Sequence, residues 1–82
     1  MSKHDVSQAT STNVARLLRK ERIRRGLSMN HVAKKSGLSQ QMVSYVERGM
    51  RNPTLDTLLR IASVLDIDLW KLIKHASNPS RR

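Results

Sequence analysis

The sequence predicts an all-α fold in which five short helices form one compact domain, and three observations support this prediction. Apolar residues recur at spacings of three and four, and no stretch shows the alternation of a β-strand. Ser, Thr, Asp and Gly, which favour helix ends, stand between the apolar segments. The chain lacks Cys and Phe, so its core must consist of packed aliphatic side chains. Each helix is too short to be stable alone, and all of them must therefore pack together.

The first helix is expected to begin at a Ser/Thr/Asn cap near Thr12 and to end at Gly26. Its apolar side consists of Val14, Leu17 and Leu18. Residues 1–11 are rich in Ser and Thr and contain no apolar run, which is typical of a flexible N-terminal tail. Residues 76–82 end in two arginines and are interpreted as a flexible basic tail. The folded domain is therefore expected over residues 12–75.

The four remaining helices are each expected to begin at a polar capping side chain. The expected caps, in chain order, are Ser28, Ser39, Thr54 and either Asp66 or Asp68. Gly37 and Gly49 are expected to end the second and third helices. The residues expected to face the core are Val32 and Ala33, Val43 and Val46, then Leu55, Leu58, Leu59, Ile61, Ala62 and Leu65, and finally Leu69, Leu72 and Ile73.

The charge of the chain indicates a polyanionic partner or an anionic surface. Sixteen Lys and Arg against six Asp and Glu give a formal net charge of +10, which by itself does not choose among DNA, RNA and lipid. The N-terminus lacks the pattern of a secretory signal, and no segment approaches the ~18 consecutive apolar residues of a membrane span. We therefore expect a cytoplasmic protein without a membrane partner.

The second and third expected helices are arranged as a helix-turn-helix. A four-residue link, Ser36-Gly37-Leu38-Ser39, contains a Gly able to adopt positive φ and a Ser able to cap the next helix. Two short helices joined in this way project the second one so that it can enter the major groove of double-stranded DNA. Helical spacing turns Val43 and Val46 inward with Glu47, and the outward residues are Gln40, Gln41, Ser44, Tyr45 and Arg48.

The outward residues have the chemistry needed to read bases. A Gln amide can pair with adenine N7 and N6 together, a Ser hydroxyl can donate or accept, and an Arg can bind guanine or phosphate. Gln40, Gln41, Ser44 and Tyr45 are therefore the candidate base-reading residues. The alternative is that the two Gln are solvated residues of an ordinary surface helix, and the adjoining turn favours the reading role. For Tyr45 the sequence leaves three contacts open: a thymine methyl, a phosphate or a partner chain.

The sequence resembles the Cro/C1-type (XRE-like) helix-turn-helix family of small bacterial and phage transcriptional regulators, which includes restriction-modification controller proteins. The resemblance covers nearly all of residues 13–73. The matching segments are Gly26-Leu27-Ser28, Val32-Ala33, Ser36-Gly37-Leu38-Ser39, Val43-Ser44, Glu47-Arg48-Gly49, Arg51-Asn52-Pro53-Thr54-Leu55, Leu58, Ile61-Ala62 and Leu65. It implies a lambda-repressor-like fold and sequence-specific binding of double-stranded DNA.

The resemblance also implies which residues contact DNA. The first positions of the recognition helix fall on Ser39, Gln40 and Gln41, and the base-facing position one turn later falls on Ser44 and Tyr45. The implied phosphate contacts are Ser28, Met29, Asn30, Ser39, Arg48, Arg51 and Asn52. Met29 departs from the Gln common at its position, and a thioether binds phosphate poorly, so backbone N–H groups or Asn30 would have to supply that contact.

A structural clamp between Arg22 and Glu47 is a further implication of the resemblance. A Glu on the inward side of the reading helix needs a partner, because an unpaired buried carboxylate is costly. The pair would lock the third helix to the first. The alternative is that both charges are simply solvated.

A homodimer is expected because one recognition helix touches too few base pairs to select a site in a genome, and a symmetric dimer on a palindrome is the usual remedy. Leu69, Trp70 and Ile73 are the expected interface residues, since the last helix already uses its inward positions for the core. The alternative is that Trp70 folds back onto the fourth helix and completes the core.

The sequence does not favour an enzyme, a metal site, a cofactor or a small-molecule ligand. His4, His31 and His75 are scattered without ligand spacing, and no catalytic or phosphate-loop motif is present. The chain is expected to have no room for a separate sensor domain, and regulation by its own concentration is the remaining possibility. Two competing functions are a protein-interaction or RNA-associated module with the same fold and a basic membrane-surface peptide. The polar outer side of the third helix and the distributed aliphatic core favour the DNA-binding domain over both.

Overall fold

The computed structural model describes residues 3–50 and 53–76, with the side chains of the first helix described from Thr10 onward. These residues form five helices: α1 (Lys3–Arg24), α2 (Met29–Ser36), α3 (Gln40–Glu47), α4 (Leu55–Val64) and α5 (Leu69–Ala76). The described part of the chain contains no strand. The predicted all-α fold of five helices is confirmed.

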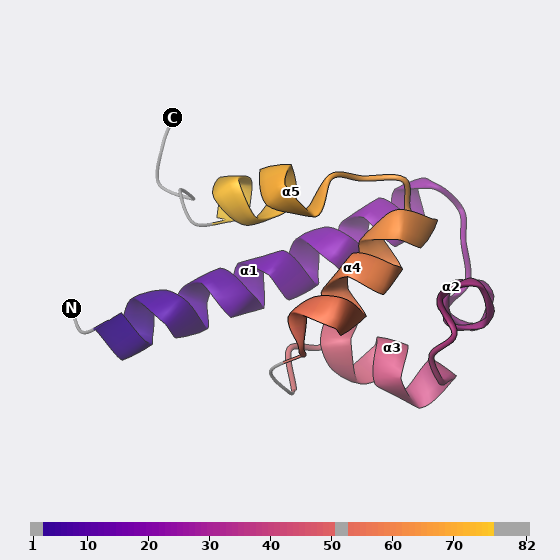
Figure 1. Cartoon of the computed structure of the whole chain (residues 1–82), viewed down its shortest axis with the longest axis horizontal. Helices are drawn as coiled ribbons and strands as arrows, with labels where there is room; N and C mark the ends of the chain where they lie inside the picture. The colour runs from indigo at the N-terminus through magenta and orange to yellow at the C-terminus, as the bar shows by residue number, and fades with distance from the viewer. Residues whose placement is uncertain (1–2, 51–52, 77–82) are drawn as a thin grey trace.

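The long helix α1 is the axis around which the others are arranged. In Figure 1, α5 lies beside α1, while α3 and α4 lie by the C-terminal half of α1 and α2 lies beyond them. Helix α2 packs against both α3 and α4, and α3 also contacts α1. The two helices of the helix-turn-helix are thus supported from behind by α1 and α4.

Polar side chains cap the four later helices at the predicted places. The Oγ atoms of Ser28 and Ser39 each accept a 3.0 Å hydrogen bond from the backbone N–H three residues later, and Thr54 Oγ1 accepts a similar bond at 3.1 Å. Asp68 accepts a 3.0 Å bond from the Trp70 N–H at the start of α5. Asp66, the other candidate for this cap, has a φ of 56° and instead ends α4.

The two ends of the domain differ from the sequence-based expectation. Helix α1 begins at Lys3, so residues 3–11 continue the helix and do not form the expected tail. Extending a helix costs much less than nucleating one, and the α1 nucleus is held by tertiary packing that the local Ser and Thr content does not reveal. At the other end α5 reaches Ala76, whose side chain is buried and whose carbonyl accepts a 3.1 Å bond from Asn13 Nδ2. The rest of the two expected tails, residues 1–2 and 77–82, lies outside the described residues.

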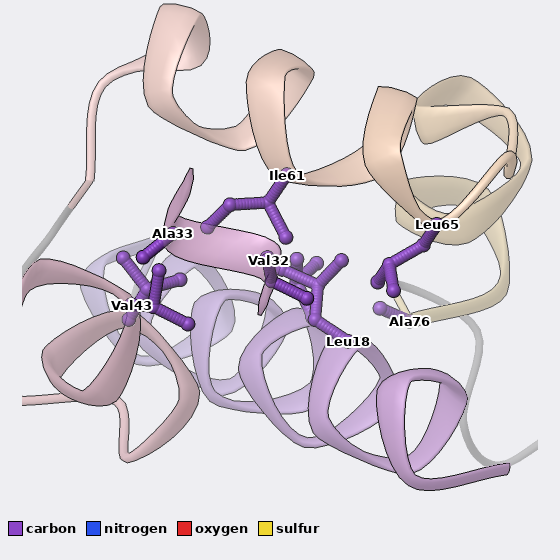
Figure 2. Close-up of a cluster of buried hydrophobic side chains, with 9 residues drawn as sticks. Leu18, Val32, Ala33, Val43, Ile61, Leu65 and Ala76 are labelled. Carbon is purple, nitrogen blue, oxygen red and sulfur yellow. The ribbon is translucent and has the colours of Figure 1, made fainter. Parts of the chain in front are cut away.

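The core is aliphatic, as predicted, and every helix contributes to it. The side chains with no exposed surface include Leu18 of α1, Val32 of α2, Val43 of α3, Ile61 of α4 and Leu65 at the C-cap of α4, and α5 adds Ala76. Two residues expected in the core, Leu55 and Leu59, are instead 62% and 49% exposed, because the apolar positions of α4 cover a wider arc than the side that packs on α2. Figure 2 shows Leu18, Val32 and Ile61 directed toward one another near the centre of this cluster. Burial of a large aliphatic side chain contributes roughly 1.5–3 kcal/mol, so this shared cluster holds together helices that would not persist alone.

Candidate nucleic-acid interface

The turn between α2 and α3 depends on a left-handed residue. Gly37 has a φ of 77°, and the following Leu38 N–H returns to the Ala33 carbonyl at 3.0 Å, which closes the end of α2. Ser39 then caps α3. A side chain at position 37 would be strained by this backbone conformation, and its Cβ would lie 3.3 Å from Arg60 Nη1.

Arg60 fastens this turn to α4, and sequence reasoning missed it. Its Nη1 donates to the carbonyl of Ser36 at 3.2 Å, and its Nε donates to Asp56 Oδ2 at 2.8 Å. The Asp56–Arg60 spacing of four residues was visible in the sequence as a helical ion pair. The bond to Ser36 joins residues far apart in the chain, and only the packing of α4 on α2 brings them together.

Helix α3 has a buried inner side and a hydrogen-bonding outer side. Val43 is fully buried and Val46 nearly so. Gln40 and Gln41 are exposed, and Ser44 and Tyr45 are partly exposed. The structure thus brings the four candidate base-reading residues together on one helix while the two valines attach that helix to the core.

Two of the candidate base-reading residues are already in contact with each other. Gln41 Nε2 donates a hydrogen bond to Tyr45 Oη at 2.7 Å, one helical turn further along α3. The contact orients an exposed amide that would otherwise sample several rotamers.

The expected charge pair connects α1 with α3. Arg22 Nε donates to Glu47 Oε2 at 2.7 Å, and Arg22 Nη2 donates to Oε1 at 3.1 Å, so the guanidinium binds the carboxylate with two parallel hydrogen bonds. The side chains are 12% and 3% exposed, respectively. Arg22 Nη1 also donates to the carbonyl of Leu27 at 2.7 Å, and therefore holds the start of the α1–α2 link as well.

The candidate phosphate-contacting residues are placed at helix ends. Ser28, Asn30, Ser39 and Arg48 are exposed, and the hydroxyls of Ser28 and Ser39 are used as caps. Met29 is partly buried and packs against the core. Its packing against the core explains why position 29 is apolar. The backbone N–H of Met29 is then the group of this residue that can bind a phosphate. Arg51 and Asn52 lie outside the described residues.

The positive charge at the C-terminal end of α1 is partly neutralised by an acidic residue of the same helix. Glu21 accepts hydrogen bonds from Arg24 and Arg25. The hydrogen bond from Arg24 holds the pKa of the Glu21 carboxyl below its ordinary value, and the same contact raises the pKa of Arg24. These two arginines therefore already share a carboxylate before any phosphate approaches.

The expected dimer residues do not all lie at the surface. Trp70 is 67% exposed and therefore does not complete the core. Ile73 is partly buried and lines a pocket of ≈ 140 Å³ together with Val14 and Leu58. Leu69 is only 5% exposed, which corrects its assignment to the interface. It is the first residue of α5 and faces the core, as its helical spacing from Leu72 and Ile73 predicts.

The arrangement of α2, turn and α3 corresponds to a known family. A family model described as helix-turn-helix matches residues 18–69, more than half of the chain. The chain belongs to the Cro/C1-type helix-turn-helix family. The resemblance seen in the sequence is thereby confirmed.

Similar proteins of this helix-turn-helix family are named as bacterial regulators. The chain is 39% identical over 69 residues to the uncharacterized HTH-type transcriptional regulator y4dJ of Sinorhizobium fredii, and the match covers 84% of each chain. It is 35% identical over 60 residues to the HTH-type transcriptional regulator SlrR of Bacillus subtilis, covering 72% of this chain and 40% of SlrR. Its structure is similar to that of the restriction-modification controller protein C.AhdI from Aeromonas hydrophila, with 36% identity and a TM-score of 0.70, covering 80% of this chain and 96% of that one.

Family membership establishes the general activity of this Cro/C1-type protein. It is a DNA-binding transcriptional regulator, and its family and relatives are not enzymes. Among the helices that the structure describes, none is long and apolar enough to cross a membrane.

Proposed function

We propose that this regulator binds a palindromic operator in double-stranded DNA as a homodimer, with α3 of each copy in the major groove. The observation that supports it is the division of α3 into two sides. Val43 and Val46 bury one side, and Gln40, Gln41 and Ser44 leave hydrogen-bonding groups on the other. Presenting polar side chains from a rigidly held short helix is what reading a base edge requires.

The proposed base readers are Gln40, Gln41, Ser44 and Tyr45. A well-placed bidentate contact discriminates against a wrong base by roughly 1–3 kcal/mol. Such a contact needs a helix that does not move when DNA arrives. The Arg22–Glu47 clamp supports this role, because it ties the end of α3 to α1 through two charge-assisted hydrogen bonds.

The proposed phosphate contacts surround the helix-turn-helix and set its orientation. Three of them lie at the start of α2: Ser28, Met29 and Asn30. The others are Ser39, which caps α3, and Arg48, Arg51 and Asn52, which follow α3 in the sequence. Phosphate contacts of this kind fix the register of a protein on the duplex without carrying sequence information. A DNA-bound regulator with these contacts acts where the chromosome is, which in a bacterium is the cytoplasm.

The proposed dimer interface is centred on Trp70, with Ile73 beside it on α5. An indole that is 67% exposed is costly to leave in water and is typical of an interface anchor. Two copies related by a two-fold axis would place two α3 helices on successive turns of the same face of DNA, about 34–36 Å apart or a multiple of that.

Selection of bound sites from random duplex DNA tests the proposal. We expect an inverted repeat whose half-sites are separated by about 10 base pairs or a multiple of that. Affinity for the selected site should fall steeply with salt, with a slope on logarithmic axes near −0.9 for each phosphate contacted, and about six contacts are expected per complex. Enrichment of no motif, or of a single half-site without a repeat, would count against the palindrome. Salt-independent binding would count against the phosphate contacts.

A further inference from the structure

We infer that Tyr45 sets base specificity through Gln41, as a positioning residue that orients the Gln41 amide for adenine, and that it is not itself a base-reading residue. This inference rests on the proposed function of α3 as the base-reading helix. Of the two residues proposed above as independent base readers, Gln41 alone then contacts a base, and Tyr45 holds the Gln41 amide in place.

The contact geometry places Tyr45 as the fixed partner and Gln41 as the oriented one. Gln41 is exposed at the start of α3, whereas Tyr45 is partly buried near its end. The backbone carbonyl of Tyr45 accepts a 3.1 Å bond from the N–H of Met50, where Gly49 with a φ of 65° turns the chain and closes α3. The Tyr45 backbone is thus held by the helix end, and its Oη lies 2.7 Å from Gln41 Nε2.

The hydrogen-bonding groups left on Gln41 match adenine. A Gln amide has two N–H donors and one carbonyl oxygen, and one N–H is donated to Tyr45. The other N–H and Oε1 form the donor and acceptor pair that adenine N7 and N6 require. Guanine presents two acceptors, N7 and O6, so the Gln41 oxygen would face an acceptor and the amide could not offer both donors. The bond to Tyr45 therefore favours adenine and disfavours guanine at one position.

Gln40 provides the matched control within the same helix. It has the same side chain, is also exposed and adjoins Gln41 in sequence. Residues five apart do not share a helical face, so Gln40 is not supported by Tyr45 in the way that Gln41 is. An effect of Tyr45 on Gln41 alone can therefore be separated from a general effect on α3.

The test is a double-mutant cycle on the operator found by selection, using duplexes changed one base pair at a time. In Tyr45→Phe we expect the adenine-over-guanine preference at one position of each half-site to fall roughly two- to tenfold, the value of one hydrogen bond. Preferences at other positions, the salt slope and the unfolding midpoint should stay unchanged. In a Gln41→Ala background Tyr45→Phe should have no further effect, whereas in a Gln40→Ala background it should keep its full effect.

A measurement on the free protein supports the cycle. The side-chain amide resonances of Gln41 should shift in Tyr45→Phe while those of Gln40 stay in place. Unshifted Gln41 resonances would overturn the inference, because the hydrogen bond would then be absent in solution.

Three binding outcomes would also overturn it. An effect of Tyr45→Phe that persists in the Gln41→Ala background would show that Tyr45 contacts DNA itself. A uniform loss of affinity with a shallower salt slope would place Tyr45 at a phosphate. Tyr45→Phe could also leave every base preference unchanged while Gln41→Ala still weakens the preference for adenine at one position. That result would remove the positioning role of Tyr45 and leave the proposed function intact. If the wild-type chain enriches no motif at all, the proposed function fails first.

Discussion

At the scale of single residues, the buried carboxylate of Glu47 shows how one charge can hold the recognition helix in place. Its side chain is 3% exposed, and both of its oxygens accept from Arg22. A buried ion pair of this kind adds little net stability over apolar packing, but breaking it leaves an unpaired charge inside the protein. The pair therefore contributes more to fixing the position of α3 than to the total stability.

Removing only the cation of this pair should be strongly destabilising. We expect Arg22→Met to lower the free energy of unfolding by about 3 kcal/mol, because it strands the Glu47 carboxylate. The double variant Arg22→Met, Glu47→Leu should recover most of this loss, because neither charge then remains buried. Urea denaturation measures both values. Arg24→Met, which removes an exposed pair, is the control and should change stability little. Equal stability of Arg22→Met and wild type would mean that the pair is solvated.

At the scale of structural elements, the turn between α2 and α3 is set by a backbone conformation and by a side chain from α4. Gly37 supplies the positive φ, and Arg60 donates to the last residue of α2 at 3.2 Å. The local sequence predicts the first of these features. The second determines where the turn sits on the rest of the domain.

The contribution of Arg60 to the turn can be separated from that of the glycine. Gly26 has a φ of 70° with open space around it, so Gly26→Ala should cost only the left-handed backbone strain of about 1–2 kcal/mol. Gly37→Ala has the same strain, and its Cβ would in addition displace Arg60 Nη1 from 3.3 Å. We expect an extra loss of about 0.5–1 kcal/mol, the value of the displaced hydrogen bond.

Thermal or urea unfolding of both glycine variants measures this difference. In an Arg60→Ala background the two substitutions should cost the same, because the displaced group is absent. A Gly37→Ala penalty that remains larger without Arg60 would assign the excess to another contact.

At the scale of the whole molecule, the apolar surface that α5 leaves exposed determines how two copies can meet. The domain uses Leu69 for its own core and leaves Trp70 in solvent. A stable interface buries about 1,200–2,000 Å² in total, and a single indole supplies only part of it, so neighbouring groups must join it. Ile73, one turn further along α5, is already partly buried and extends the apolar surface toward α1 and α4.

Charging this surface should separate the two copies without unfolding either. Trp70→Glu should run as a monomer in light scattering while wild type runs as a dimer, and operator affinity should fall at least tenfold because each half-site then binds alone. The exposed indole contributes little to the monomer core, so helicity and unfolding midpoint should change little. Ser63→Glu places the same charge on an exposed position of α4 and should keep the wild-type mass. A folded Trp70→Glu protein with the wild-type mass would exclude this interface.

The local sequence was sufficient to predict where the later helices begin and which side of α3 faces inward. Ser28, Ser39 and Thr54 cap the helices expected of them, because a capping hydroxyl and the N–H that it satisfies are only three residues apart. The inward turn of Val43 and Val46 follows from helical periodicity in the same way. The local sequence does not distinguish Asp66 from Asp68 as the cap of α5, because either carboxylate can cap a helix. The backbone conformation decides it, since Asp66 has a positive φ and Asp68 accepts the capping hydrogen bond.

The sequence by itself therefore determined the fold class, the caps, the helix-turn-helix and the outer residues of α3, because each depends on neighbours within one or two helical turns. Tertiary structure decided the start of α1 at Lys3, the exposure of Leu55 and Trp70, and the bond from Arg60 to Ser36. These depend on which helices pack together, and packing joins residues that are distant in the chain. Gln41 and Tyr45 lie between the two cases, since their spacing of four is local but their hydrogen bond depends on the rotamers that α3 adopts in the folded domain.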